Sequence, residues 1–447
     1  MDCGFDSPEK IAKCIEIARP WFDIASGLAN LASVVGLSIT TALVWMLSRL
    51  RKDLNKWQAE VAHEKELRGY AEQTTKEAQH RAELSESAAT RDRDSLGKLK
   101  ATIDASEDEL RKKVVSVQTE LDETNGRITA ALTMTDGPAA RFWSRPVGLR
   151  LVGYESLLAA SIPILLFGNL KGGVGKSTLV TNLAAAFANR GERILTIDLD
   201  YQGSHSSLAQ IQNDASDQAP DSRIDFLFQD ELDPNWQKLA IRPITSTLDY
   251  ISAFYDFEKI ERSVEYRWAL AAVKDDVRYR LARALLEPEI QEKYDRILID
   301  APPRFTLGFV NGFCAATHLY VPTVVDGLSA AAVESFARQF IELKPIVNPQ
   351  ISWSGIIGTM TFANPNEPLT LTKTAEAAAI EAEHIAQRRL KTKEPLFIRK
   401  PVIKRDSVLA RATEKGIAYL NESSVRPMFD ELAIAIESKA PSRKTRA

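Results

Sequence analysis

The hydrophobic and polar positions of this 447-residue chain follow two patterns, long helical repeats near the N-terminus and short apolar runs in the remainder. The first feature is an uncharged run from Ile24 to Leu47. A helix rises 1.5 Å per residue and about 20 apolar residues cross a bilayer, so this run is long enough to span one. Trp21 and Trp45 near its ends, and the basic flank at 49–52, are typical of a span whose C-terminal side is cytoplasmic.

We therefore predict an N-terminal tail over residues 1–20 and a transmembrane helix over residues 21–48, which makes this a single-pass protein of the inner membrane. Several Ser, Thr and Asn side chains make the run only moderately hydrophobic, so a buried helix in a soluble oligomer is the alternative. Small residues at spacings of three and four would also allow close helix packing in lipid. This stripe comprises Ala25, Ala29, Ser33, Gly36 and Thr40.

Residues 49–136 are charged, free of proline and rich in helix formers, which predicts a long helical stalk. A heptad pattern indicates a coiled coil, either straight or folded back on itself. The alternatives are a single solvated helix and a partly disordered charged linker. The apolar seam comprises Ile103, Leu110, Val114, Val117, Leu121 and Ile128, with Leu50, Leu54, Trp57 and Val61 nearer the start.

Asp136-Gly137-Pro138 ends the stalk, and residues 137–160 are predicted to form a linker. Its amphipathic part, residues 149–160, is expected to pack on the following domain or to lie at a membrane surface. That domain is predicted over residues 161–438 and is followed by a basic tail over 439–447.

The next pattern carries chemistry: an apolar run at 162–167 precedes the sequence Lys-Gly-Gly-Val-Gly-Lys-Ser-Thr at 171–178, and a helical stretch follows. A strand, a glycine-rich turn and a helix N-terminus form a binding site for a nucleotide polyphosphate. The backbone N–H groups of the turn converge on the phosphates, while Lys176 reaches the β- and γ-phosphates and the Ser177 hydroxyl binds Mg²⁺. The predicted nucleotide-binding set is Gly172, Gly173, Val174, Gly175, Lys176, Ser177 and Thr178.

Two further apolar runs each end in carboxylates. Residues 194–197 lead into Asp198 and Asp200, whose spacing of two places both carboxylates on one side of a strand end. Residues 296–299 lead into Asp300 and then into two prolines that break regular structure.

Composition excludes several kinds of binding partner and site. The formal net charge of −3 gives no overall attraction to nucleic acid or anionic lipid. Three cysteines do not make a disulfide framework, and the histidines show no ligand spacing, so no structural zinc is predicted. The remaining chemistry is phosphoryl transfer to water.

Because a second lysine, Lys171, stands at the front of the loop, residues 171–178 resemble the deviant Walker A motif of the ParA/MinD family of ATPases. The resemblance covers roughly residues 161–438 and implies a doubly wound α/β domain with a mainly parallel sheet, ATP and Mg²⁺. In that family the front lysine reaches across a dimer interface to the partner's ATP, and Lys171 occupies the matching position. A flexible surface lysine is the alternative.

The two carboxylate segments resemble the family's metal and switch regions. By that resemblance Asp198 and Asp300 support the metal, and Asp200 positions or deprotonates the attacking water. Tyr201 stands where the family usually has proline, which leaves the position of that water open. Residues 402–406 look like a stretch near the adenine, so Arg405 is either a contact to the base or a surface arginine.

The resemblance implies an ATPase whose domains pair when ATP binds and separate after hydrolysis, and the uncharged run adds a membrane anchor with these domains in the cytoplasm. Its partners would be a second copy or a higher homo-oligomer, the membrane, and an unknown protein, with positioning or partitioning of DNA or protein cargo as the output. Nonspecific DNA is a further candidate partner, through Arg399, Lys400, Lys404, Arg405 and Arg411. A nucleotide-gated signalling or defence effector is the alternative, and a tyrosine kinase of the polysaccharide-export type ranks below it because no second span precedes the domain.

Overall fold

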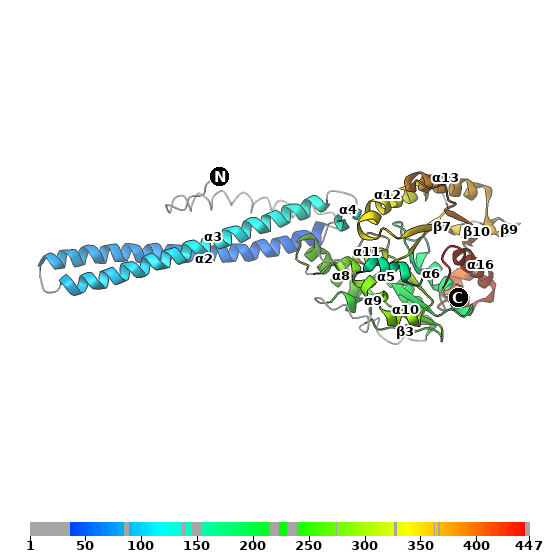
Figure 1. Cartoon of the computed structure of the whole chain (residues 1–447), viewed down its shortest axis with the longest axis horizontal. Coiled ribbons are helices and arrows are strands. Elements are labelled where there is room, and N and C mark those ends of the chain that lie inside the picture. Colours follow the sequence, from blue (N-terminus) through cyan, green and yellow to red (C-terminus); the bar gives the residue numbers. More distant parts are fainter. Residues whose placement is uncertain are drawn as a thin grey trace. The chain divides into compact units, whose positions relative to one another are not determined.

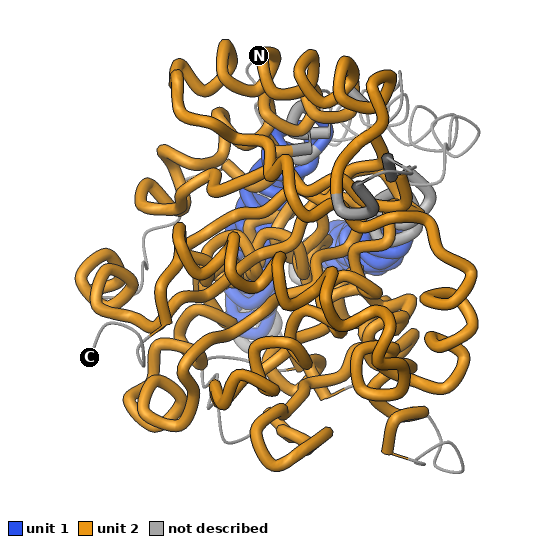
Figure 2. The backbone as a smooth tube through the Cα atoms, turned by 90° about the vertical axis from the view of Figure 1, so that its right-hand side faces the viewer, with its two compact units in different colours: residues 1–132 blue, residues 133–447 orange. Residues whose placement is uncertain are grey.

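The computed structural model describes residues 36–84, 89–135, 139–144, 153–213, 223–229, 239–273, 275–325, 329–361, 363–364 and 367–442. The chain forms two compact units, residues 1–132 and 133–447, which Figure 2 shows in different colours.

The first unit is a helical hairpin of α2 (Gly36–Leu84) and α3 (Ala89–Thr135), which lie side by side in Figure 1. The two helices are antiparallel, because an earlier residue of α2 contacts a later residue of α3. Glu64 accepts a hydrogen bond from the Ser106 hydroxyl at 3.4 Å, whereas Trp57 lies beside Lys113. The Lys113 ammonium lies 5.3 Å from the centre of the Trp57 ring. The predicted stalk is therefore folded back rather than straight.

The predicted seam is the contact between the two helices. All ten of its apolar residues are half-buried, whereas Val115, beside the seam, is 52% exposed. Exposed i,i+4 ion pairs such as Arg127–Glu123 lie on the surface and add little stability. The helical nature of this region is confirmed.

The predicted transmembrane helix lies largely outside the described residues, which begin at Gly36. From Gly36 onward its sequence forms the start of α2. Among the helices of the described ranges, none has the length and apolar character needed to cross a bilayer.

The second unit is built on a mainly parallel eight-stranded sheet in the order β10-β7-β6-β1-β5-β2-β4-β3, which confirms the predicted mainly parallel α/β domain. Among the strands of the described ranges, β3 runs antiparallel to β4 and the other pairs of this sheet are parallel. The strands are β1 (Ile164–Phe167), β2 (Ile194–Asp198), β3 (Arg242–Pro243), β4 (Leu248–Ile251), β5 (Arg296–Asp300), β6 (His318–Val324), β7 (Ser352–Thr361) and β10 (Phe397–Lys404), and β8 (Ala363–Asn364) pairs with β9 (Glu367–Leu371) separately.

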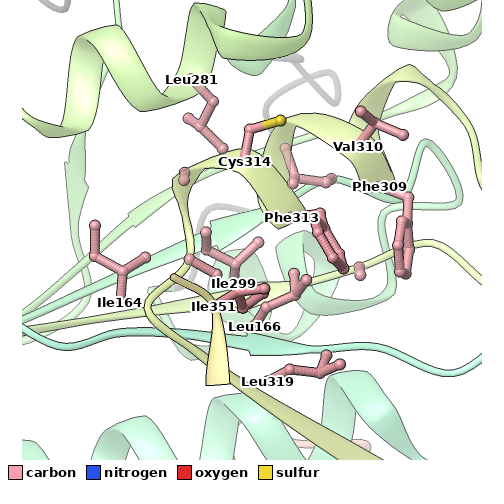
Figure 3. Close-up of a cluster of buried hydrophobic side chains, with 14 of the residues drawn as sticks. Ile164, Leu166, Leu281, Ile299, Phe309, Val310, Phe313, Cys314, Leu319 and Ile351 are labelled. Atoms are coloured by element: carbon pink, nitrogen blue, oxygen red, sulfur yellow. The ribbon is translucent and has the colours of Figure 1, made fainter. Parts of the chain in front are cut away.

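Helices cover both faces of the sheet, as its strand sequences require. Successive side chains of a strand point to opposite faces, so Leu166 and Ile299 enter one core and Leu165 and Leu298 the other. The first core contains α11 (Leu307–Ala315), whose Phe309 and Phe313 pack over the central strands (Figure 3).

The remaining helices divide between these two cores. The first core also receives α4 (Ala139–Trp143), α5 (Tyr154–Ala160), α8 (Tyr255–Ala269), α9 (Arg280–Leu285), α10 (Pro288–Lys293), α12 (Ser329–Val347) and α13 (Lys373–Leu390). The second receives α6 (Lys176–Asn189), α14 (Ser407–Thr413), α15 (Ala418–Asn421) and α16 (Arg426–Glu437). The short helix α7 (Ser204–Gln212) follows β2.

Two boundary segments belong to this domain. Within the predicted linker, α5 buries Tyr154 and Leu158, and the Tyr154 hydroxyl donates to the Cys314 carbonyl. At the other end the Lys439 ammonium donates to the Ser354 carbonyl at 2.9 Å and Ala440 is fully buried. The described part of the predicted tail, up to residue 442, therefore packs on the domain.

The folded-back hairpin predicts a specific crosslink. In a chain with Cys3 and Cys14 changed to Ser, Glu64→Cys with Ser106→Cys should form an intramolecular disulfide on mild oxidation, because these side chains meet. The control, Glu64→Cys with Arg127→Cys, moves the second thiol 21 residues along α3, about 31 Å, and should not. Non-reducing gels report the outcome, and disulfide-linked dimers of Glu64→Cys alone would instead indicate a parallel, straight coil.

Candidate nucleotide-binding site

The phosphate-binding loop joins the end of β1 to the start of α6, as the sequence predicts. Gly173 and Gly175 have φ values of 71° and 77°, the left-handed region that glycine adopts without a Cβ penalty. Lys176 and Ser177 are the first residues of α6. The free N–H groups of this helix end, together with its dipole, favour an anion at the loop.

Two polar side chains outside the motif fix this loop. The Asn169 amide donates to the Pro322 carbonyl at 2.7 Å and its oxygen accepts from the Lys171 N–H at 2.9 Å. The Thr359 hydroxyl, on β7, donates to the Val174 carbonyl at 2.7 Å. Asn169 lies two residues before the motif, but the sequence gives no sign of its partner Pro322, which is 153 residues away.

The three catalytic strands end at the same level. In the register of the sheet Phe167 pairs with Asp300, and Asp300 pairs with Asp198. The loop after β1 and the carboxylates after β2 and β5 therefore meet at one edge, where parallel sheets bind their ligands. Lys171, Lys176, Ser177, Asp198, Asp200 and Asp300, all predicted from the sequence, lie at this edge.

Asp198 is fully buried and holds the turn that follows β2. One of its oxygens accepts from the Asp200 N–H at 2.9 Å, and the other accepts from the Ser206 N–H at 3.0 Å and hydroxyl at 2.7 Å. Burial, and then the neighbouring Asp300, raises the pKa of Asp198 well above its usual range. Its observed contacts are those of a residue that supports the site from behind.

Asp300 is also buried but, unlike Asp198, neither of its carboxylate oxygens has a hydrogen-bond partner in the described structure. The Ser177 hydroxyl lies near enough to lower its pKa but outside bonding geometry. Burial nevertheless raises the pKa of Asp300 to about 7, while Lys176 opposes the shift. Burial likewise lowers the pKa of Lys176, and Asp300 and Asp200 oppose that change.

These unpartnered oxygens fit a magnesium ion. Buried polar groups without partners are rare and costly, and hard cations prefer oxygen ligands. In the described part of the chain no group of three or more His, Cys, Asp and Glu residues would hold a metal by itself. Mg²⁺ is commonly held by one or two protein oxygens together with substrate phosphates.

Asp200 lies beyond the strand end, partly buried, between two cations. Burial raises its pKa first, and Lys176 and Arg304 then lower it. Arg304 also donates to the Tyr201 hydroxyl, and its guanidinium carbon lies 5.1 Å from the centre of that ring. Tyr201, in the position of the family's proline, is thus held by a residue from the loop after β5.

The sequence also predicts two roles for basic residues, a contact from Arg405 to the base and a DNA-binding run at 399–411. Arg405 is exposed at the carboxyl end of β10, where its N–H donates to the Thr361 carbonyl at 2.9 Å, so a contact to the base stays a prediction. Within the proposed DNA-binding run, three of the five cations face carboxylates: Arg399 pairs with Glu376 and Glu383, Lys400 with Glu431 at 3.9 Å, and Lys404 with Asp406 at 2.9 Å. This pairing weakens the run as a basic surface.

Sequence comparisons agree with this geometry. A family model described as an AAA domain matches residues 162–353. The chromosome partitioning protein ParA of Caulobacter vibrioides is 30% identical over 202 residues, which cover 45% of this chain and 71% of that protein. The chain belongs to the ParA/MinD family of P-loop ATPases. The chromosome-partitioning ATPase Soj of Thermus thermophilus is 26% identical over 208 residues, covering 46% of this chain and 72% of Soj.

Among solved structures, an ATP complex of McdA from Cyanothece covers 62% of this chain and 96% of its own, with 16% identity and a TM-score of 0.49. As a ParA/MinD-type protein the chain is an ATPase, with ATP as its substrate. The N-terminal hairpin lies outside the matched family segment, residues 162–353.

The unpartnered Asp300 predicts an unusual pH dependence of stability without nucleotide. Its pKa of about 7 means that, above pH 4, the folded protein keeps a proton that the unfolded chain has released. The free energy of unfolding should therefore fall as pH rises from about 4 to 7, by up to about 1.4 kcal/mol per pH unit from this group. Asp300→Asn should flatten that slope, measured by tryptophan fluorescence in denaturant at pH 5 to 8.

The matched control is Asp256→Asn, which removes an exposed carboxylate. It should keep the wild-type slope. Equal slopes for Asp300→Asn and wild type would show that Asp300 is not the buried, unpartnered acid described above.

Proposed function

We propose that this protein is a nucleotide-driven switch: two copies pair when ATP fills the site and separate after hydrolysis. The observation that carries the proposal is the meeting of Lys176, Asp200 and Asp300 at one sheet edge, beneath a loop that begins with a second lysine. The similarity to ParA and Soj supports partitioning or positioning as the output.

The chain's own residues divide the work of hydrolysis. The loop N–H groups and Lys176 bind and orient the triphosphate, and Asp200 orients the attacking water or takes its proton. Burial raises the pKa of Asp200, which suits it to accept a proton, and Lys176 and Arg304 oppose that rise. Ser177 and Asp300, with Asp198 behind them, would hold Mg²⁺, which neutralises charge on the phosphates.

Lys171 is proposed to act across the dimer. It is partly exposed at the front of the loop, and its carbonyl lies 3.5 Å from the Lys176 ammonium. An additional cation at a triphosphate stabilises the charge that develops during phosphoryl transfer. If the partner supplies that cation, hydrolysis becomes conditional on pairing, and ATP shifts the population toward the pair by its differential affinity.

We further propose that the chain is attached to the membrane through residues 21–48 and acts there on a protein or DNA cargo. The support is the uncharged run from Ile24 to Leu47 and its aromatic and basic flanks. DNA binding would have to rely on Arg405 and Arg411, the two exposed members of the basic run for which no ion pair is observed. It predicts ATP-dependent, salt-sensitive binding to DNA of any sequence.

Substitution of the two lysines should affect different steps, Lys176 the binding of ATP and Lys171 its turnover. Lys176→Ala should weaken binding of ATP strongly, since it removes the buried cation at the phosphates. Lys171→Ala should bind ATP within a few-fold of wild type but lose about 10- to 100-fold in turnover, as expected for a group acting mainly in the transition state. Binding is measured with a fluorescent ATP analogue, turnover by phosphate release, and pairing by sedimentation with a nonhydrolysable analogue.

A monomeric wild-type protein under saturating analogue and Mg²⁺ would contradict the switch. Equal turnover of Lys171→Ala and wild type would contradict the role of Lys171 but leave the ATPase assignment intact.

Membrane attachment predicts that the chain stays with the membrane fraction during alkaline washing. Deletion of residues 1–48 should release it while leaving ATP turnover within about two-fold, because the site lies in the second unit. A full-length chain that is extracted by alkali would contradict the anchor. Loss of the cellular effect with intact turnover fits both cargo positioning and a membrane effector, and capture of the cargo distinguishes them.

A further inference from the structure

A short helix that precedes the ATPase core is tied to the loop after β5. Trp143, at the end of α4, is fully buried. Its indole N–H donates to the carbonyl of Phe305 at 2.8 Å, across 162 residues of sequence. Phe305 directly follows Arg304, the residue that contacts Tyr201 and lowers the pKa of Asp200.

The backbone of α4 is held from a second side by two other elements. The Trp268 indole N–H, on α8, donates to the Phe142 carbonyl at 3.0 Å. The Arg278 guanidinium donates to the Trp143 carbonyl at 2.7 Å and pairs with Asp276 at 2.7 Å. Because Arg278 is 1% exposed, its charge-assisted hydrogen bond to the Trp143 carbonyl is shielded from solvent.

The same helix α8 also fixes the start of α11. The Glu261 carboxylate accepts from the Gly308 N–H at 2.8 Å, and the Glu265 carboxylate accepts from the Leu307 N–H at 3.0 Å. Carboxylates at a helix N-terminus satisfy its free N–H groups and its dipole. Helix α8 therefore holds α4 with its C-terminal end and the residues after the loop with its middle.

The loop between β5 and α11, residues 301–306, is thus held by α4 at the Phe305 carbonyl. Helix α8 holds the residues that directly follow the loop. The Phe305 ring fills the space beneath, 4.4 Å from the ring centre of Phe309 and 6.1 Å from that of Phe336. Phe305 cannot shift without carrying Trp143 along or leaving a buried indole N–H unpaired, which costs as much as the lost hydrogen bond or more.

We propose that the ATPase site is coupled to α4, the helix that follows the helical hairpin in the sequence. Trp143 is the positioning residue for hydrolysis in this coupling. Trp143 acts through the Phe305 carbonyl, which sets the place of Arg304 beside Asp200. A change of the 301–306 loop with nucleotide state, as switch loops of P-loop proteins undergo, is passed to α4 by the same bond. This inference rests on the proposed ATPase cycle.

The test compares Trp143→Phe with a matched control in the full chain. Trp353→Phe removes an indole from the same core, but the Trp353 N–H has no hydrogen-bond partner in the described structure. Turnover and KM are measured for each variant. Hydrogen exchange of residues 139–144 is followed with and without a nonhydrolysable ATP analogue and Mg²⁺.

For Trp143→Phe we expect kcat to fall about 2- to 10-fold, the effect of one hydrogen bond of ordinary strength, with KM changed less than about two-fold. In wild type and Trp353→Phe the analogue should alter exchange at 139–144, and in Trp143→Phe it should not. The wild-type exchange measurement needs no substitution, so it stands even if Trp143→Phe folds poorly.

No analogue-dependent change at 139–144 in wild type, or equal kcat for the two Trp variants, would overturn the coupling alone. Failure of the underlying function looks different: wild-type turnover would then not exceed that of Lys176→Ala.

Discussion

The parallel register of β1, β5 and β2 is the constraint on which the site depends. It sets the end of β1 beside Asp300 and Asp300 beside Asp198, so the phosphate-binding loop and these two carboxylates converge at one sheet edge, with Asp200 just beyond. Apolar side chains on both faces fix that register, because a shift of one residue would turn each strand's buried positions to the wrong face. The chemistry is therefore positioned by the core.

This placement has an energetic consequence. Asp198, Asp300 and Lys176 are all buried, and of the two carboxylates only Asp198 has both oxygens satisfied by protein groups. Asp300 and Lys176 lie near each other, each with a pKa shifted toward its neutral form by burial. Such a site is less stable than a neutral core would be, and Mg²⁺ at Asp300 with a triphosphate at Lys176 would supply partners for these two groups.

The sequence predicted what local pattern encodes. The loop at 171–178, the carboxylates at the strand ends and the heptad seam are all contiguous or regularly spaced, and each lies where its pattern indicated. The fold-back of the hairpin was left open, since the same seam serves a straight coil and a hairpin. Contacts of Asn169, Ser206, Arg304 and Trp143 were missed, because each depends on a partner that only the folded chain brings near.

Asp300, with two buried and unpartnered carboxylate oxygens, is the protein group proposed to bind Mg²⁺ together with ATP. The most direct measurement is the affinity for a nonhydrolysable ATP analogue with and without Mg²⁺, in wild type and Asp300→Asn. Mg²⁺ should tighten binding to wild type, and Asp300→Asn should lose most of this gain while binding the metal-free analogue at least as well. The same gain from Mg²⁺ in both proteins would contradict this role of Asp300.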